Sequence, residues 1–424
     1  MSHYNQGLGL YVHFPYCSQR CPYCDFTLTT APIPHQAYLQ ATLGELEQRL
    51  REFYELGWTG QALTSLYFGG GTPGLWSSKS IGAFIERSAQ LLGFRNDIEI
   101  TLEANPAEVN LSTLHEWRAI GVNRLSLGAQ SMRVESLKRL GRTHLPEDVR
   151  EVVDWARLVG LERVSLDLIH GLSGEGERDA LYDLNEILSL SPSHISLYQL
   201  TIEAQTHFGA RSRRGETLIE PEERLISIYN ALADRLSEAG YPLYEVSNAS
   251  LQGEESKHNL LYWTMGEYLG IGTGAHGRID LPPQLSSPFS THPKERRALR
   301  WQNIRSPKDY LKFSKAEISL QKLEEERAEL DEEALDEERV LVGLRLMDGL
   351  KVTRELENRY GAHARQLESE GLLKIDQHAH QVYPQRDPFN VNTNEEEGIL
   401  PRWWIPTPRG REILDHVAYR LILG

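Results

Sequence analysis

Cysteine is scarce in this sequence: the chain of 424 residues has three, and all of them lie between positions 17 and 24. An odd number of crowded thiols excludes a disulfide framework and agrees with a reducing compartment. No run approaches the roughly 20 apolar residues of a membrane helix. The first ten residues show no basic patch followed by an apolar stretch, so we expect no secretory signal and a cytoplasmic location.

Basic residues are also in deficit, because 45 Lys and Arg face 60 Asp and Glu and give a net charge of −15. A chain with this balance lacks the basic face of a general nucleic-acid binder, so no nucleic-acid partner is expected. The composition, 40% hydrophobic and 25% charged, is otherwise that of an ordinary globular protein. Its length allows two or three domains.

The three cysteines, Cys17, Cys21 and Cys24, follow the spacing C-x3-C-x2-C. Structural zinc normally takes four ligands, and cubane iron–sulfur clusters normally take four cysteines. Three thiolates on one short loop can hold three irons and leave the fourth iron open to a non-protein ligand, which favours a cluster that performs chemistry. Two alternatives stay open: buried structural thiols, and a zinc site that His13 completes.

The first 240 residues alternate short apolar runs with amphipathic helical stretches, which predicts an α/β fold around a parallel sheet. The expected strands are residues 9–13, 65–68, 98–103, 124–127, 163–168 and 194–200. The expected helices are residues 35–54, 77–92, 111–120, 146–159, 177–190 and 221–239. Six such units in series predict a barrel, or an open six-unit version of one.

Polar residues follow these strands at the same end. The cysteines come after the first strand. The groups at the ends of the second to sixth strands are the glycine motif of residues 69–73, Glu103, Gln130, Asp167 and Thr201. Active sites of barrels form at the C-terminal strand ends, so we expect all these groups at one mouth.

These motifs resemble those of radical S-adenosylmethionine (SAM) proteins and, more narrowly, of the HemN-like family, which contains coproporphyrinogen III dehydrogenases and heme chaperones. The resemblance implies a partial (β/α)6 barrel of the radical SAM type. It also implies a [4Fe–4S] cluster on the three cysteines, with SAM chelating the open iron. The SAM-contacting residues that it implies are Tyr11, Tyr23, Gly70, Gly71, Thr72, Glu103, Gln130, Arg142, Asp167 and Thr201.

Two features favour the heme-chaperone branch. The dehydrogenases carry a further cysteine two residues after the third cluster cysteine, where this chain has Phe26, and a long N-terminal arm, where sixteen residues precede Cys17 here. The pattern H-N-x-x-Y-W, which that branch associates with heme binding, implies His258, Asn259, Tyr262 and Trp263 as heme contacts. A hydrogen-bonded structural role for His258 stays open. His276 is expected to be a structural or cofactor-site residue rather than a ligand.

The C-terminal third departs from the strand–helix rhythm. Residues 317–347 are expected to be helical, with the acidic run 324–338 as a solvated face. Residues 372–375 and 381–383 are expected to pair as a small wing, and residues 384–406 read as a polar insertion. Helices plus a wing predict a winged-helix-like domain, as the family has. The expected domains are a radical SAM partial barrel (1–240), a flanking segment with the H-N-x-x-Y-W motif and a linker (241–315), and the winged-helix-like domain (316–424).

The first functional hypothesis is a heme-binding chaperone that delivers heme to acceptor proteins and carries a SAM-coordinated [4Fe–4S] cluster. The alternatives are an oxygen-independent coproporphyrinogen III dehydrogenase and a plain iron–sulfur electron carrier, which has no use for an open iron. Whether the chain is an enzyme stays open, and no residue is assigned a catalytic role. The expected partners are heme and heme-accepting proteins, membrane-bound respiratory ones included. We expect the chain to be a cytoplasmic monomer or dimer without a membrane span, which reaches membrane-bound acceptors from the cytoplasm.

Overall fold

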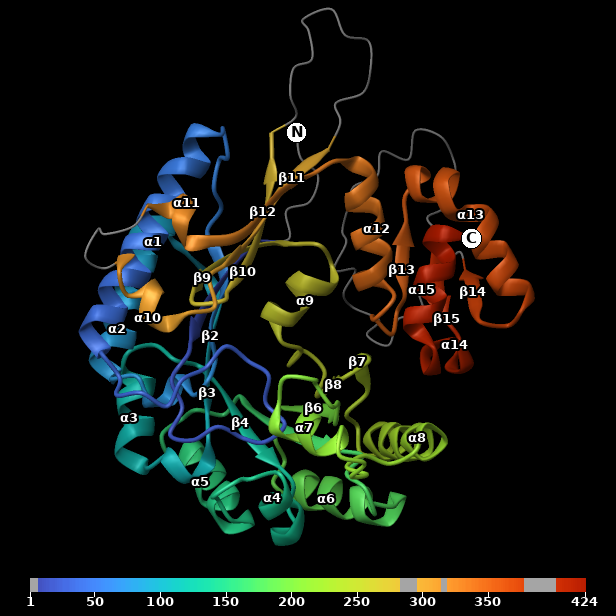
Figure 1. The fold of residues 1–424 in the computed structure, drawn as a ribbon, viewed down its shortest axis with the longest axis horizontal. Helices are drawn as coiled ribbons and strands as arrows, with labels where there is room; N and C mark the ends of the chain where they lie inside the picture. The colour runs from blue at the N-terminus through green and yellow to red at the C-terminus, as the bar shows by residue number, and fades with distance from the viewer. Residues whose placement is uncertain (1–6, 283–295, 314–318, 377–401) are drawn as a thin grey trace, which may run out of the picture.

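Twelve strands of the computed structural model form one sheet, counted over the residues that the structure describes: 7–282, 296–313, 319–376 and 402–424. Their order is β12-β11-β10-β9-β1-β2-β3-β4-β5-β6-β8-β7 (Figure 1). Their bounds are β1 (Leu8–Phe14), β2 (Leu63–Gly70), β3 (Phe94–Ala104), β4 (Arg124–Gln130), β5 (Val164–His170), β6 (His194–Gln199), β7 (Leu243–Glu245), β8 (Asn248–Ser250), β9 (Glu267–Gly272), β10 (His276–Leu281), β11 (Arg297–Asn303) and β12 (Glu324–Leu330).

Strands β1 to β6 are parallel, and helices connect each to the next. The long helices are α1 (His35–Glu55), α2 (Ser78–Leu92), α3 (Leu111–Ala119), α5 (Pro146–Leu158), α6 (Glu177–Ser189) and α8 (Glu222–Glu238). These are the six strands and six helices expected from the sequence, so the predicted α/β fold is confirmed. Four shorter helices of the described residues were not predicted: α4 (Val134–Arg139), α7 (His207–Ser212), α9 (Lys257–Trp263) and α10 (Pro307–Tyr310).

The sheet is open. Strand β9 runs parallel to β1 on the side away from β2, and β6 pairs antiparallel with β8 instead of closing onto β1. Strands β10, β11 and β12 then extend the sheet beyond β9 in antiparallel order. The prediction of a partial barrel is therefore confirmed, with an extension that the strand–helix rhythm did not indicate.

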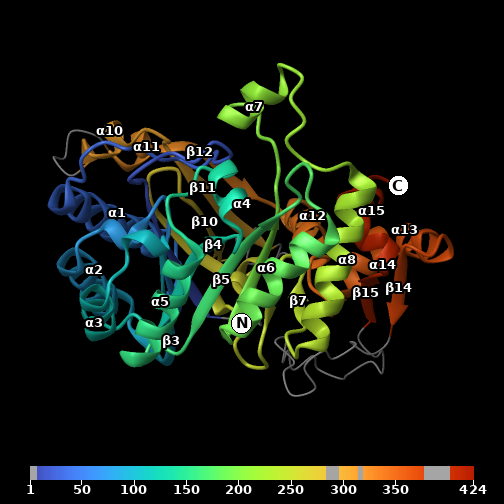
Figure 2. The ribbon, with the colours of Figure 1, turned by 90° about the horizontal axis from the view of Figure 1, so that it is seen from below.

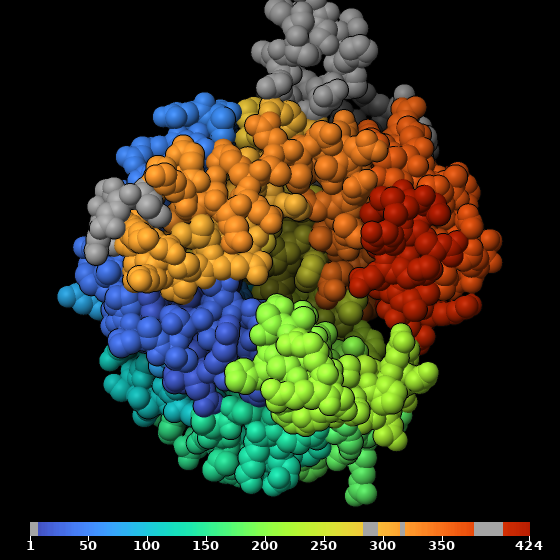
Figure 3. Space-filling view, viewed as in Figure 1, coloured from blue at the N-terminus to red at the C-terminus, as the bar shows by residue number. Residues whose placement is uncertain are grey.

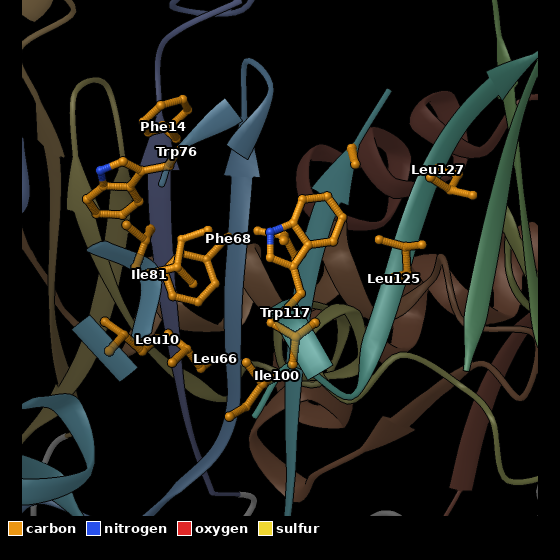
Figure 4. Close-up of a cluster of buried hydrophobic side chains, with 14 of the residues drawn as sticks. Leu10, Phe14, Leu66, Phe68, Trp76, Ile81, Ile100, Trp117, Leu125 and Leu127 are labelled. Carbon is orange, nitrogen blue, oxygen red and sulfur yellow. The ribbon is translucent and has the colours of Figure 1, made fainter. Parts of the chain in front are cut away.

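Side chains of the parallel strands alternate between two faces of the sheet, as the pleat requires. Leu10, Leu66, Ile100 and Leu125 are buried on the face that the helices cover, where Trp117 packs among them (Figure 4). The intervening residues of the same strands are largely polar or aromatic and point to the opposite face. One face of the sheet is thus a dry core, and the other can carry a site.

The acidic segment that starts at Glu324 is a strand, so the first half of the helix predicted for residues 317–347 is wrong. Apart from the short α11 (Leu320–Leu323), helix begins at α12 (Glu332–Gly343), after β12 has paired with β11. Glutamate favours helix locally. Pairing with β11 and the 2.8 Å ion pair of Glu324 with the buried Arg49 override that preference. The exposed charges of β12 also protect the open edge of the sheet.

The C-terminal region has its own small core and its own sheet (Figures 1 and 2). Helices α12, α13 (Arg354–Ser369), α14 (Pro408–Glu412) and α15 (Leu414–Leu423) accompany strands in the order β13 (Leu350–Val352), β15 (Arg402–Pro406) and β14 (Leu373–Asp376). Residues 381–383 of the predicted wing lie outside the described residues. The polar insertion predicted for 384–406 is wrong at its end, because β15 pairs with β14 and buries Trp404.

The C-terminal region contacts the β7 edge of the large sheet. Glu245 forms a backbone bridge with Leu346, and its carboxylate accepts from Arg345 at 3.1 Å. The core of the large sheet includes residues up to Leu323, and the second core begins at Val340. The domain boundaries stay predictions. Within the described residues, none of the helices combines the length and apolar character that crossing a bilayer requires.

Candidate functional site

A cavity of about 380 Å³ opens at the carboxyl ends of the parallel strands, beside the loop that follows β1. Its lining includes the predicted residues Cys17, Cys21, Cys24, Tyr23, Gly70, Gly71, Thr72, Glu103, Gln130, Arg142, Asp167 and Thr201. The structure thus brings these residues together at one mouth, while their roles stay predictions. Tyr11 and the H-N-x-x-Y-W residues lie outside this lining.

Backbone hydrogen bonds hold the cysteine loop in place at two points. Thr29 N–H donates to the Pro15 carbonyl at 2.6 Å and Cys17 N–H donates to the Thr29 carbonyl at 3.0 Å, which closes the base of the loop. Farther out, the Pro22 carbonyl accepts from Phe208 N–H of the α7 helix at 2.8 Å. These contacts anchor the loop at both its base and its far side.

The glycine motif after β2 allows close contact with this loop. A Cβ atom at Gly71 would lie 2.7 Å from the Tyr16 carbonyl oxygen and 3.0 Å from Cys17 Sγ. Gly70 has φ +115°, a conformation that side chains rarely adopt. The end of β2 and the cysteine loop can therefore approach this closely because both positions are glycine.

Two polar side chains donate hydrogen bonds to cysteine sulfur. Thr72 Oγ1 donates to Cys17 Sγ at 3.4 Å, and the Arg142 guanidinium donates to Cys21 Sγ at 3.5 Å. Burial raises the pKa of the Cys17 thiol to about 11, so a metal would have to displace its proton. Donors to ligating sulfur tune an iron–sulfur cluster. Three soft donors at one cavity, two of them with donor partners, fit a three-cysteine cluster.

These residues fit a site for a single metal ion less well than a site for a cluster. Among the described residues, no group of three or more His, Cys, Asp or Glu side chains could hold one metal ion. His13 accepts at Nδ1 from the Tyr11 hydroxyl at 3.0 Å and donates from Nε2 to the Thr27 carbonyl at 2.8 Å. Both ring nitrogens are engaged, so His13 does not complete a zinc site in this geometry. In a cubane each cysteine binds a different iron and the sulfurs need not converge.

Two carboxylates lie at the base of the cavity. Glu103 accepts from the Tyr67 hydroxyl at 2.8 Å and from Gly70 N–H at 3.1 Å, and burial raises its pKa to about 7. Asp167 accepts from the Ser126 hydroxyl at 3.2 Å, and burial raises its pKa to about 6. Both groups can accept from the hydroxyl or ammonium donors of a ligand.

Gln130 occupies a strained position at the end of β4. Its φ is +63°, in the left-handed region that few non-glycine residues adopt. The pairing of β4 with β5 shifts register between Leu127 and Gln130. Such outliers cluster at functional sites. The backbone strain therefore supports the functional assignment of Gln130, which came from its strand position and from the family resemblance.

Asn105 belongs to the site and was missed by the sequence analysis. Its Oδ1 accepts from Arg142 at 2.6 Å and its Nδ2 donates to Thr72 Oγ1 at 2.9 Å. Asn105 therefore links Arg142, which donates to Cys21, with Thr72, which donates to Cys17. Asn105 lies two residues after the predicted strand 98–103, so the rule that selected Glu103 could have found it. Other lining residues that were missed are His144 and Tyr198.

The H-N-x-x-Y-W motif forms a hydrogen-bonded structure on the polar side of the sheet. The two ring nitrogens of His258 are bonded to Ser65 Oγ at 2.8 Å and to the Tyr262 hydroxyl at 2.7 Å. Burial lowers the pKa of His258 to about 3, so the ring is neutral. This geometry matches the structural alternative for His258.

The other motif residues diverge from one another. Asn259 Nδ2 donates to the Tyr244 hydroxyl at 3.4 Å, and Trp263 packs under Arg345, whose guanidinium carbon lies 4.5 Å from the ring centroid. Tyr262 lines a second cavity. The four side chains therefore contact different partners, and their role as heme contacts stays a prediction.

A family model described as the radical SAM superfamily matches residues 11–187. The heme chaperone HemW of Haemophilus influenzae is 40% identical over 291 residues, which are 68% of this chain and 75% of that protein. HemW of Escherichia coli is 38% identical over the same shares. The mitochondrial radical S-adenosyl methionine domain-containing protein 1 of Mus musculus is 41% identical over 272 residues, which are 64% of this chain and 60% of that protein.

Among solved structures, coproporphyrinogen III oxidase (HemN) of Escherichia coli matches with a TM-score of 0.73 and 19% identity, covering 98% of this chain and 90% of that one. At that identity the match shows the fold alone. The radical SAM family implies SAM and a [4Fe–4S] cluster, which the cysteine cavity fits. The identities with HemW over three quarters of its length place the chain more narrowly: it belongs to the HemW family of radical SAM proteins.

Proposed function

We propose that this chain binds heme and delivers it to acceptor proteins. One observation carries the proposal: 40% identity with a relative named heme chaperone, over 75% of that relative's length. Phe26 supports it, because the dehydrogenases that the sequence resembles have a cysteine at this position. The fold that this chain shares with HemN does not decide between the two activities.

We propose further that Cys17, Cys21 and Cys24 hold the cluster and that the rest of the cavity holds SAM. When bound and reduced, these cofactors can supply a carbon radical that abstracts hydrogen. The chain's own residues bind and orient. Arg142 suits a carboxylate because its planar fork bonds such groups bidentately.

The other proposed SAM contacts follow from the positions of hydrogen-bond acceptors in the cavity. Glu103 and Asp167 present oxygens to hydroxyl or ammonium groups, and Gln130 adds an amide. Tyr23, Thr201 and the glycine motif line the same space. Tyr11 instead bonds to His13 and acts on the cavity indirectly, behind the end of β2.

The acceptors in this proposal are heme proteins that include membrane-bound respiratory ones. The chain would meet them in the cytoplasm and approach the membrane through the acceptor. A delivery role needs a heme site that opens to a partner, since a fully enclosed heme could not be handed over.

The test is heme transfer from protein whose cluster has been reconstituted anaerobically. Heme-loaded protein is mixed with respiratory membranes stripped of heme, and b-type cytochrome is followed by its reduced-minus-oxidised spectrum. The proposal expects faster cytochrome formation than with free heme at the same concentration. Failure to bind heme, or transfer no faster than free heme, would refute it.

A further inference from the structure

A second cavity, of about 390 Å³, lies across the cysteine loop from the first. Asp25 and Phe26 line both cavities, so this short segment forms the wall between them. The other walls come from Tyr11 and His13 of β1 and from α9, β9, β10 and the end of β11. In Figure 3 the face is hollowed where the blue N-terminal segment, the orange β11–β12 segment and the yellow-olive α9 region meet.

Aromatic side chains give this cavity apolar walls. The side chain of Phe26 is 58% exposed, although its neighbours in the loop are anchored. Tyr262 and Tyr268 pack edge to face with ring centroids 4.6 Å apart. Exposed aromatic surface in a hollow favours a flat, largely apolar ligand, because burying that surface releases water.

His276 offers an unused imidazole at the rim. The side chain is exposed at the start of β10, and its imidazole makes no hydrogen bond, ion pair or ring contact with another residue that the structure describes. Partial burial, and after it the charges of Arg305 and Arg300, lower the pKa of His276, which favours the neutral ring. A neutral imidazole with a free nitrogen is a standard axial ligand for heme iron.

Arg305 adds a cation on the same rim. Its side chain is 62% exposed, and its ion pair with Glu325 is loose, at 4.0 Å. Its Nη2 and Nε donate to the side-chain oxygen of Gln302 at 3.0 and 3.1 Å. The exposed guanidinium keeps further N–H groups that can pair with a carboxylate of a ligand. The cavity therefore combines an aromatic wall, a free imidazole and an available cation, which match the ring, the iron and a propionate of heme.

We infer that this second cavity is the docking site for the heme cargo, with His276 as the axial ligand, Phe26 and Tyr262 against the ring, and Arg305 facing a propionate. The inference rests on the proposed function. His258 is then a positioning residue: it bonds the Tyr262 hydroxyl at 2.7 Å and holds that ring at the cavity. The shared wall at Phe26 places the cargo next to the cluster loop.

The test compares heme titrations of the reconstituted full chain and two variants, read by absorption spectra. His276→Ala is expected to lose the spectrum of histidine-ligated heme and to weaken binding by roughly tenfold or more. Free imidazole should restore that spectrum. His115→Ala is the control, because His115 is an exposed histidine on α3 outside both cavities. It should titrate like the wild type.

Iron-free protoporphyrin separates ring docking from iron ligation. Its fluorescence-detected binding should be weakened by Phe26→Ala and by Arg305→Glu, and it should be unaffected by His276→Ala. Binding of the iron-free ring that is indifferent to Phe26→Ala and Arg305→Glu would overturn the assignment of the cavity.

The two levels of the inference can fail separately. A wild-type chain that does not bind heme would refute the proposed function and this site with it. A wild type that binds heme, with His276→Ala identical to it in affinity and spectrum, would refute the site alone.

Discussion

Asn105 is hydrogen-bonded to both Arg142 and Thr72, the two residues that donate to cysteine sulfur. Its replacement should therefore weaken SAM binding without removing a cysteine that would hold the cluster. In Asn105→Leu the side chain keeps its approximate volume and loses these two contacts, together with the 3.2 Å bond from Nδ2 to the Glu108 carboxylate. The 2.6 Å bond from the Arg142 guanidinium involves a charged donor, and such bonds contribute about 1.5–3 kcal/mol. At about 1.4 kcal/mol per tenfold, the SAM dissociation constant should rise about 10- to 100-fold.

The assay is anaerobic equilibrium dialysis of SAM against reconstituted protein, with iron per chain measured on the same samples. Asn105→Asp is the matched variant, because it keeps an acceptor for Arg142 and removes the donor to Thr72 Oγ1 and to the Glu108 carboxylate. Its SAM affinity should stay within a few-fold of the wild type. SAM binding by Asn105→Leu that equals the wild type, at equal iron content, would refute the reasoning.

Three further variants test the cavity and the fold. Gly71→Ala should lose most cluster iron, whereas Gly176→Ala, whose Cβ would meet nothing closer than 3.8 Å, should keep it; equal iron would contradict the packing argument. Arg49→Met should lower the unfolding free energy by about 3–5 kcal/mol in urea titrations, because it leaves the buried carboxylates that pair with Arg49 uncompensated; no loss would show that the ion pairs contribute little. Glu103 has a pKa of about 7 in the folded state, whereas in the unfolded state it loses its proton above about pH 4.5. The free energy of unfolding should therefore fall as the pH rises from about 4.5 through about 7, by at most about 3 kcal/mol. Unfolding titrations of Glu103→Gln at pH 5 and 8 should lack this fall, and a variant that keeps it would assign the fall to other groups.

The parallel half of the fold was predictable because its signals are local. Leu10 and Leu66 face the helices while Tyr11 and Tyr67 face the other side, and this two-residue alternation is written in each strand. The polar residues at the strand ends follow from the same pattern. Topology then brings them together, as it does for Glu103 and the cysteine loop, without any further information.

The remaining features depend on contacts between distant segments. Nothing local makes the segment at Glu324 a strand; its pairing with β11 and its contact with Arg49 do. His258 could not be distinguished from a heme ligand until Ser65 and Tyr262 were found on its two nitrogens. Asn105 lay within reach of the strand-end rule, but its importance comes from its two partners, which are 33 and 37 residues away.

The central proposal is that this chain binds and delivers heme rather than converting coproporphyrinogen III. One anaerobic incubation tests it most directly: reconstituted protein with SAM, a strong reductant, coproporphyrinogen III and heme, followed by gel filtration and chromatography of the porphyrins. The account predicts heme in the protein fraction and unchanged coproporphyrinogen. Decarboxylated product, with no heme in the protein fraction, would contradict it and assign the chain to the dehydrogenase activity.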